Sequence, residues 1–235
     1  MLHSRIRDIQ SQITRATLSA KRPEGCVRLV AVSKKQSVQA VSEAHAAGLI
    51  EFAENYADEL CEKVEALRAQ KNIRWVFIGQ LQSNKIAKIV RCADEIQSIS
   101  SEKHARLIDR HVADLNQSEY PVWIVVNAAA EESKQGVSLG QLPQLAQFIS
   151  RECPHLSLQG IMAIPPQSYS DEAWAGPLNY CVPPLYSDLR KAATGTGAGR
   201  LSLGMSGDLG LSIAAGSDCV RIGTAIFGVR DVSKT

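Results

Sequence analysis

The chain has 235 residues, of which 45% are apolar and 21% are charged, and its formal net charge is +2. This composition is typical of a globular protein that forms one large domain or two small ones. Lysine and arginine are spread along the chain without a dense basic run, which argues against a nucleic-acid-binding surface. No apolar stretch approaches the length of a membrane span, so we expect neither nucleic acid nor a membrane as a partner.

The six cysteines are dispersed and form no CxxC pair. This pattern argues against a zinc site and against a disulfide scaffold, and it suits the reducing environment of the cytoplasm. We therefore expect a cytoplasmic protein without a metal site. The cysteines are Cys26, Cys61, Cys92, Cys153, Cys181 and Cys219.

The first 22 residues are rich in Arg, Ser and Thr and poor in acidic residues, as in a transit peptide. However, Ile6, Ile9, Ile13 and Leu18 follow the spacing of one helix face, and the apolar core of a signal peptide is absent. The pattern predicts an amphipathic helix that covers the body of the protein.

Beyond residue 26, short apolar runs alternate with segments of helical spacing. Strict alternation of strand and helix indicates parallel strands joined by crossover helices. Eight such units in about 200 residues fit a closed (β/α)8 TIM barrel, which we expect to be the single domain of residues 1–235. A doubly wound open sheet is the alternative. The runs cover residues 27–33, 50–53, 74–78, 95–99, 121–127, 156–162, 200–203 and 218–222.

Residues 165–199 fit this alternation poorly because they contain several prolines and a glycine-rich run. We expect an irregular loop, then a helix that begins near Pro184 and runs through Leu189, and then a glycine turn. Proline is tolerated in the first turn of a helix, which supports that start. No second domain and no internal repeat is apparent in the sequence.

Lys34 comes directly after the first apolar run and is the strongest candidate for a functional residue. Lysine is a poor strand residue and is rarely buried. A desolvated lysine amine can be neutral and nucleophilic, and such an amine forms Schiff bases with carbonyl compounds. The alternative is that Lys34 is a solvated loop residue beside Lys35.

Polar residues also follow the other predicted strands. The carboxyl ends of barrel strands meet at one face, and barrel enzymes have their active sites there. Some of these polar residues are expected to cap helices instead. Ser101 and Asp208 precede segments of helical character, and Asn55 is open to either interpretation.

The loops after the last two strands carry a more specific signal. Ser206, Gly223 and Thr224 lie where such barrels bind phosphate, and glycine lets the backbone come close to an anion. Because the first strand neighbours the eighth in a closed barrel, Lys34 would lie beside Arg221, whose charge would lower the lysine pKa. A phosphate site, a reactive lysine and an arginine together suggest pyridoxal 5′-phosphate.

Several sequence blocks resemble the YggS/PROSC family of pyridoxal 5′-phosphate homeostasis proteins, and they occur in the family's order over nearly the whole chain. The family is similar in fold to the barrel domain of alanine racemase. The blocks are Ala31–Lys34, Glu54–Tyr56, Ile78–Lys85, Ser133–Gly136, Gly160–Pro165, Leu201–Asp208 and Val220–Gly228.

The resemblance implies a role for each candidate residue. Lys34 would carry the cofactor as a Schiff base, and Arg221 would face the pyridine nitrogen. Lys134 could be a second amine for cofactor transfer, or an ordinary solvated lysine. The phosphate would be held by Ser206, Gly223 and Thr224, and the cofactor would be lined by Asn55 and Met205.

The resemblance implies a protein that binds pyridoxal 5′-phosphate and releases it to apo-enzymes without evident catalysis. The alternative is an amino-acid racemase, which needs a second base opposite the lysine, such as Tyr56 or Tyr169. Racemases take that base from an additional domain, and the chain ends seven residues after Gly228. We therefore expect a non-catalytic monomer. A third hypothesis is a barrel aldolase that uses Lys34 on a phosphorylated sugar.

Overall fold

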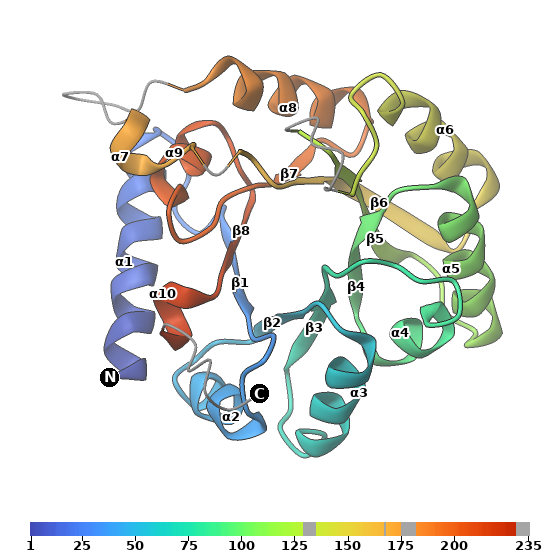
Figure 1. Ribbon diagram of the computed structural model, residues 1–235, viewed down its shortest axis with the longest axis horizontal. Coiled ribbons are helices and arrows are strands. Elements are labelled where there is room, and N and C mark those ends of the chain that lie inside the picture. The colour runs from blue at the N-terminus through green and yellow to red at the C-terminus, as the bar shows by residue number, and fades with distance from the viewer. Residues whose placement is uncertain (129–134, 167, 175–181, 229–235) are drawn as a thin grey trace.

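The computed structural model describes residues 1–128, 135–166, 168–174 and 182–228. Within them, strands form a closed ring in chain order and helices surround it (Figure 1). The strands are β1 (Arg28–Val32), β2 (Glu51–Glu54), β3 (Arg74–Phe77), β4 (Glu95–Ile99), β5 (Tyr120–Val126), β6 (Leu156–Ala163), β7 (Arg200–Ser202) and β8 (Cys219–Ile222). The predicted parallel barrel is confirmed, and the open-sheet alternative is wrong because β1 pairs with β8.

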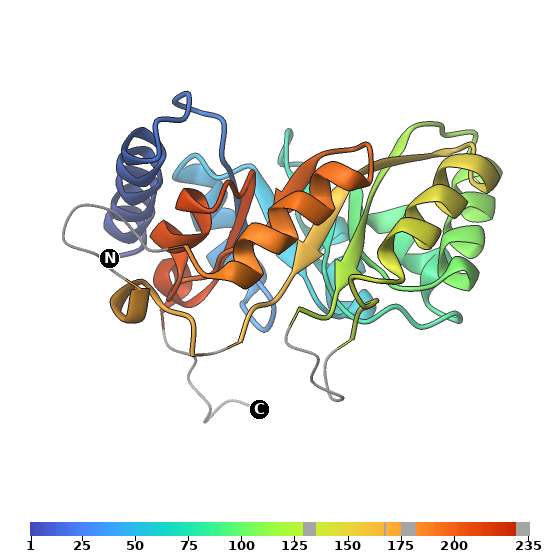
Figure 2. The same ribbon diagram turned by 90° about the horizontal axis from the view of Figure 1, so that it is seen from above.

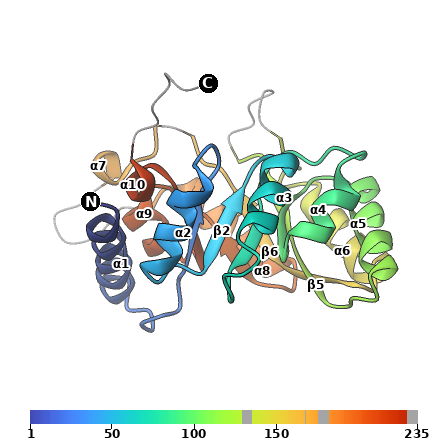
Figure 3. The ribbon, with the colours of Figure 1, turned by 90° about the horizontal axis from the view of Figure 1, so that it is seen from below.

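The helices follow one another around the outside of the ring, and Figure 3 shows this order for α2 to α5. They are α1 (Leu2–Ser19), α2 (Val38–Ala46), α3 (Ala57–Ala66), α4 (Ile86–Cys92), α5 (Glu102–Asp114), α6 (Leu142–Glu152), α7 (Asp171–Trp174), α8 (Pro184–Gly195), α9 (Leu209–Ala214) and α10 (Thr224–Phe227). The predicted helix start near Pro184 is confirmed, and Ser101 caps α5 by accepting a hydrogen bond from the His104 N–H at 3.2 Å.

The barrel interior is layered because alternate residues of each strand point inward. At the amino end of the strands, Arg28 forms ion pairs with Glu51 and Glu95. The middle layer contains an apolar cluster in which Trp123 is the largest side chain. The buried members of this cluster are Val30, Ala53, Val76, Trp123 and Cys219. The carboxyl ends of the strands are left for polar side chains.

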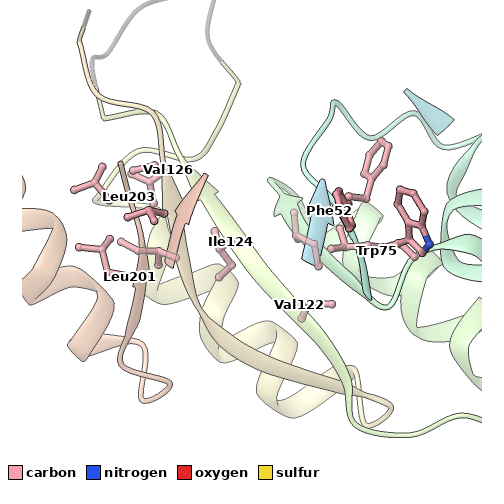
Figure 4. Close-up of a cluster of buried hydrophobic side chains, with 14 of the residues drawn as sticks. Phe52, Trp75, Val122, Ile124, Val126, Leu201 and Leu203 are labelled. Atoms are coloured by element: carbon pink, nitrogen blue, oxygen red, sulfur yellow. The ribbon is translucent and has the colours of Figure 1, made fainter. Parts of the chain in front are cut away.

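The larger core lies between the strands and the helices. Phe52 of β2 and Trp75 of β3 point out of the barrel and contact each other, with ring centroids 5.9 Å apart (Figure 4). Ile124 and Leu201 contribute to the same buried cluster from β5 and β7. These outward apolar residues fix which residues of each strand must point inward, and so they fix which side chains reach the site.

Helix α1 covers the barrel on the side of α9 and α10, as Figure 2 also shows. Ile6, Ile9 and Ile13 are buried as predicted, and the amphipathic helix is confirmed. Leu18 is 55% exposed, so its place in the buried stripe was wrong. Thr17 lies on the buried face instead, because it is the residue four positions after Ile13.

One disulfide joins Cys61 of α3 to Cys92 of α4, with their Cα atoms 5.5 Å apart. The cysteine spacing predicted no disulfide framework, and this bridge corrects that expectation. The two residues lie 31 positions apart and meet because α3 and α4 are neighbours around the barrel. None of the helices in the described part of the chain combines the length and the hydrophobicity that a membrane span requires.

Candidate functional site

A cavity of about 330 Å³ lies at the carboxyl ends of the strands. It brings together all seven residues that the sequence proposed, although they come from four separate parts of the chain. Val32, Ile78, Met162 and Ile164 form its apolar walls. The proposed residues in its lining are Lys34, Asn55, Met205, Ser206, Arg221, Gly223 and Thr224.

Lys34 reaches this cavity because of strand alternation. It lies two residues after the end of β1 and continues the inward series of Val30 and Val32, whereas Ser33 points toward the helices. Lys34 is half-buried, and its neighbour Lys35 is exposed. The geometry therefore favours a lysine directed at a ligand over a solvated loop residue.

Arg221 is a buried cation at the base of the cavity, only 4% exposed. Its guanidinium donates to Ser202 Oγ at 2.6 Å and to the Ala163 carbonyl at 2.8 Å. Ser202 in turn donates to Gln97 Oε1 at 2.8 Å, so its hydroxyl presents a lone pair to the arginine. Burial lowers the pKa of Arg221 from its ordinary value, because removing the cation from water disfavours the charged form.

Arg221 thus has neutral oxygen partners in the described part of the chain. A buried cation without a carboxylate on it is costly, and it gains from a ligand atom that carries a lone pair or negative charge. Such an atom could approach from the cavity.

The loops after β7 and β8 form another part of the cavity wall, beside β1. Ser206 Oγ accepts a hydrogen bond from the Ala225 N–H at 3.3 Å, which joins the two loops. Gly223 precedes α10, and a Cβ built on it would lie 3.2 Å from the Val32 carbonyl. A hydroxyl and backbone N–H groups of this kind suit an anionic group such as a phosphate.

Asp208 stands at the predicted start of α9, but its carboxylate does not cap that helix. It accepts from the Met205 N–H at 2.7 Å and from the hydroxyls of Tyr186 and Ser212. The predicted capping role is therefore wrong. Asp208 instead fixes the loop that carries Met205 and Ser206, and no local sequence pattern indicated these partners.

Asn55 lines the cavity, and the N-cap position of α3 belongs to Tyr56, so the capping alternative for Asn55 is wrong. Its Oδ1 is buried and accepts no hydrogen bond from the described residues. Its backbone touches the next loop closely, because a Cβ on Gly79 would lie 1.9 Å from the Asn55 carbonyl oxygen. Only glycine fits there.

A second cavity of about 230 Å³ adjoins the first, and the two share Asn55, Ile78, Met162 and Ile164. Gln135 also lines it. Lys134, the proposed second amine, lies outside the described residues, so its role stays a prediction.

The sequence did not indicate the buried polar cluster behind Lys34. Lys63 of α3 donates to the Ser33 carbonyl, to Glu54 Oε1 and to Glu59 Oε1, each at 2.7 Å. The side chains of Lys63 and Glu54 are 3% and 0% exposed. Two signals were present in the sequence: Glu54 belongs to the Glu54–Tyr56 block, and Glu59 and Lys63 are four residues apart, a spacing that usually marks a surface pair.

A family model for the alanine racemase N-terminal domain matches residues 9–231. The barrel agrees with this match. The solved alanine racemase of Corynebacterium glutamicum superposes with a TM-score of 0.65 at 16% identity, and the alignment covers 97% of this chain and 62% of that one. At that identity the likeness concerns the fold alone. The match and the barrel define the chain as an alanine racemase-like barrel protein.

Closer relatives narrow the assignment. A pyridoxal phosphate homeostasis protein from Pasteurella multocida is 38% identical over 235 residues, which is 99% of either chain. PipY from Synechococcus elongatus PCC7942, solved with pyridoxal phosphate bound, superposes with a TM-score of 0.76 at 28% identity and covers 97% of this chain and 100% of PipY. The chain belongs to the family of pyridoxal phosphate homeostasis proteins, as its sequence blocks predicted.

Proposed function

We propose that this chain binds pyridoxal 5′-phosphate as a Schiff base on Lys34 and takes part in the homeostasis of that cofactor, without evident catalysis. The observation that carries the proposal is that Lys34 and Arg221 line one cavity with the loops after β7 and β8. The names of the relatives and the cofactor bound to PipY support the same ligand.

The cavity residues fit this cofactor. In the proposal Arg221 faces the pyridine nitrogen, while Ser206, Gly223 and Thr224 hold the phosphate. Asn55 and Met205 line the remaining walls. When bound, the cofactor supplies an aldehyde for an amine and a ring that withdraws electrons.

Arg221 has a chemical consequence for the bound ring. A guanidinium keeps its proton in proteins, so it donates a hydrogen bond to the ring nitrogen without protonating it. A carboxylate at that position would keep the ring cationic and strengthen it as an electron sink. With Arg221 the ring would be a weaker electron sink, and racemisation on such a site would still need a second base opposite Lys34.

The racemase alternative needs a second base at the cavity. Tyr56 is 51% exposed and borders a neighbouring depression, and Tyr169 packs on Tyr186 with ring centroids 5.5 Å apart. Neither belongs to the described lining of the cavity. This arrangement supports a protein that holds the cofactor and releases it to apo-enzymes. We further propose a cytoplasmic monomer, which follows from the family resemblance.

The test is an absorbance spectrum of the purified protein before and after borohydride reduction, followed by peptide mapping. We expect a visible Schiff-base band that collapses on reduction and leaves the label on Lys34. Lys34→Ala should remove the band and keep the fold, whereas the exposed Lys35→Ala should keep both. A protein that takes up no added cofactor would refute the proposal and favour the aldolase hypothesis. Turnover of a D- or L-amino acid would favour the racemase.

A further inference from the structure

The backbone on either side of Lys34 is held by the same helix. On one side, the Ser33 carbonyl accepts a hydrogen bond from Lys63 Nζ at 2.7 Å. On the other side, the Lys35 N–H donates to Glu59 Oε1 at 2.5 Å. Glu59 and Lys63 both belong to α3, which follows the next strand along the barrel. Lys34 is thus bracketed by two contacts to one rigid element.

The two bracketing side chains are also bonded to each other and to the barrel. Lys63 pairs with Glu59 at 2.7 Å across one helical turn and with Glu54 of β2 at 2.7 Å. Glu54 Oε1 also accepts from Ser33 Oγ at 2.6 Å. Because Lys63 and Glu54 are buried, the contacts keep their strength and a single geometry. The cluster is built to hold one arrangement of the β1–α2 connection.

The backbone at Lys35 needs such a hold. Its φ is 60°, in the left-handed region that is unfavourable for residues with a Cβ. A non-glycine residue keeps this conformation only when its surroundings impose it, and such residues cluster at functional sites. Glu59 is the side chain that accepts the Lys35 N–H. The Gln36 N–H also closes this turn by donating to the Ser33 carbonyl at 3.0 Å. Glu59 adds the side-chain acceptor at Lys35, the residue that carries the unfavourable φ.

We propose that Glu59 and Lys63 are positioning residues for Lys34. They clamp the backbone before and after it, and they thereby set the direction in which its amine enters the cavity. Neither side chain belongs to the described lining of that cavity, so they act through the backbone. The inference rests on the proposed function only for its cofactor readout, since the reactivity of Lys34 can be measured in the cofactor-free protein.

Glu59→Ala is the test variant, because Glu59 is 21% exposed and alanine is a good helix former. Glu65→Ala is its matched control, since it removes a carboxylate from the same helix that is 74% exposed. Two quantities are measured: the affinity for pyridoxal 5′-phosphate, and the rate at which acetic anhydride labels Lys34 in cofactor-free protein, read by peptide mass spectrometry.

We expect Glu59→Ala to weaken cofactor affinity about ten-fold, the equivalent of one hydrogen bond to a charged group. It should also change the pH profile of Lys34 labelling. Glu59→Gln should stay within about three-fold of the wild type, because its amide oxygen can still accept from Lys35. Glu65→Ala should match the wild type in both measurements.

A second substitution separates a backbone clamp from a general effect on α3. Lys35→Gly, placed in the Glu59→Ala background, lets residue 35 adopt φ 60° at little cost. We expect it to restore most of the lost affinity and the wild-type labelling profile. If Glu59→Ala behaves like Glu65→Ala, or if Lys35→Gly restores nothing, the inference is wrong. If even the wild type binds no cofactor, the proposed function fails, and the labelling profile alone decides the inference.

Discussion

Replacing Lys63 by methionine should destabilise the protein more than most single substitutions. Lys63→Met keeps the length of the side chain but removes an ammonium that three oxygen atoms share. Glu54 would remain as a carboxylate that is 0% exposed, without its cation. Breaking a buried ion pair on one side costs about 3–5 kcal/mol. For a chain of this size, that cost lowers the melting temperature by about 6–20 °C.

The measurement is urea or thermal unfolding followed by circular dichroism. Glu54→Gln combined with Lys63→Met is the control, because it removes both charges and leaves an amide that can still accept from Ser33. The double variant should regain most of the lost stability, since a buried pair is often no more stable than its neutral replacement. The reasoning would be refuted if the free energy of unfolding of Lys63→Met lay within about 1 kcal/mol of the wild type, because an exposed ion pair contributes no more than that.

The pH dependence supplies an independent check on the same variant. Burial raises the pKa of Glu54, and the charge of Lys63 opposes that rise. Without Lys63 the folded-state pKa should rise further above the unfolded value. A carboxyl of this kind favours the folded state fully below its unfolded pKa, and the benefit is lost as pH rises through the folded pKa. The loss of stability in Lys63→Met should therefore be smaller at acidic pH than at neutral pH. In the double variant, which lacks the Glu54 carboxyl, this pH dependence should disappear.

Three further outcomes can be measured on the same preparations. Reducing the disulfide between α3 and α4 should lower the free energy of unfolding by up to about 4 kcal/mol, from the chain entropy of a loop of 31 residues, and an unchanged denaturation midpoint would contradict this. Gly79→Ala should displace the Asn55 carbonyl and lower the free energy of unfolding by about 1–3 kcal/mol, which chemical denaturation would detect. Ser202→Ala removes an acceptor from the buried Arg221 and should cost about 1.5–3 kcal/mol, with a shifted spectrum of bound cofactor; an unaltered spectrum would separate Ser202 from the cofactor site.

The cavity was predictable from the sequence because, in a parallel barrel, the position of a residue relative to its strand almost suffices to place it in space. Any residue that follows a strand lies at the same face, so Lys34 and Arg221 could be placed together without knowledge of side-chain contacts. The eight alternating runs fixed this frame. The apolar residues of these runs pack against segments far away in the chain, but their spacing is visible within each run. A single sequence therefore reveals them.

The polar cluster on α3 was not predictable in the same way. Glu59 and Lys63 are spaced like an exposed pair on any helix, and nothing in their neighbourhood indicates that this face of α3 meets the β1–α2 connection. Asp208 is a similar case. Its carboxylate oxygens accept hydrogen bonds from the Met205 N–H and the Tyr186 hydroxyl, and they do not cap the helix that Asp208 precedes. Contacts between segments far apart in the chain leave no local pattern.

The cavity residues and the polar cluster on α3 are connected through β1, because successive residues of a strand point to opposite sides. At the end of β1, Lys34 continues the inward series and lines the cavity, while Ser33 points outward and bonds to Glu54. In this strand the inward residue lines the cavity while its outward neighbour is bound on the side of the helices. This division predicts that the residues which control Lys34 lie outside the barrel, on α3, where substitutions leave the cavity wall intact and change only the path of the backbone that delivers the amine.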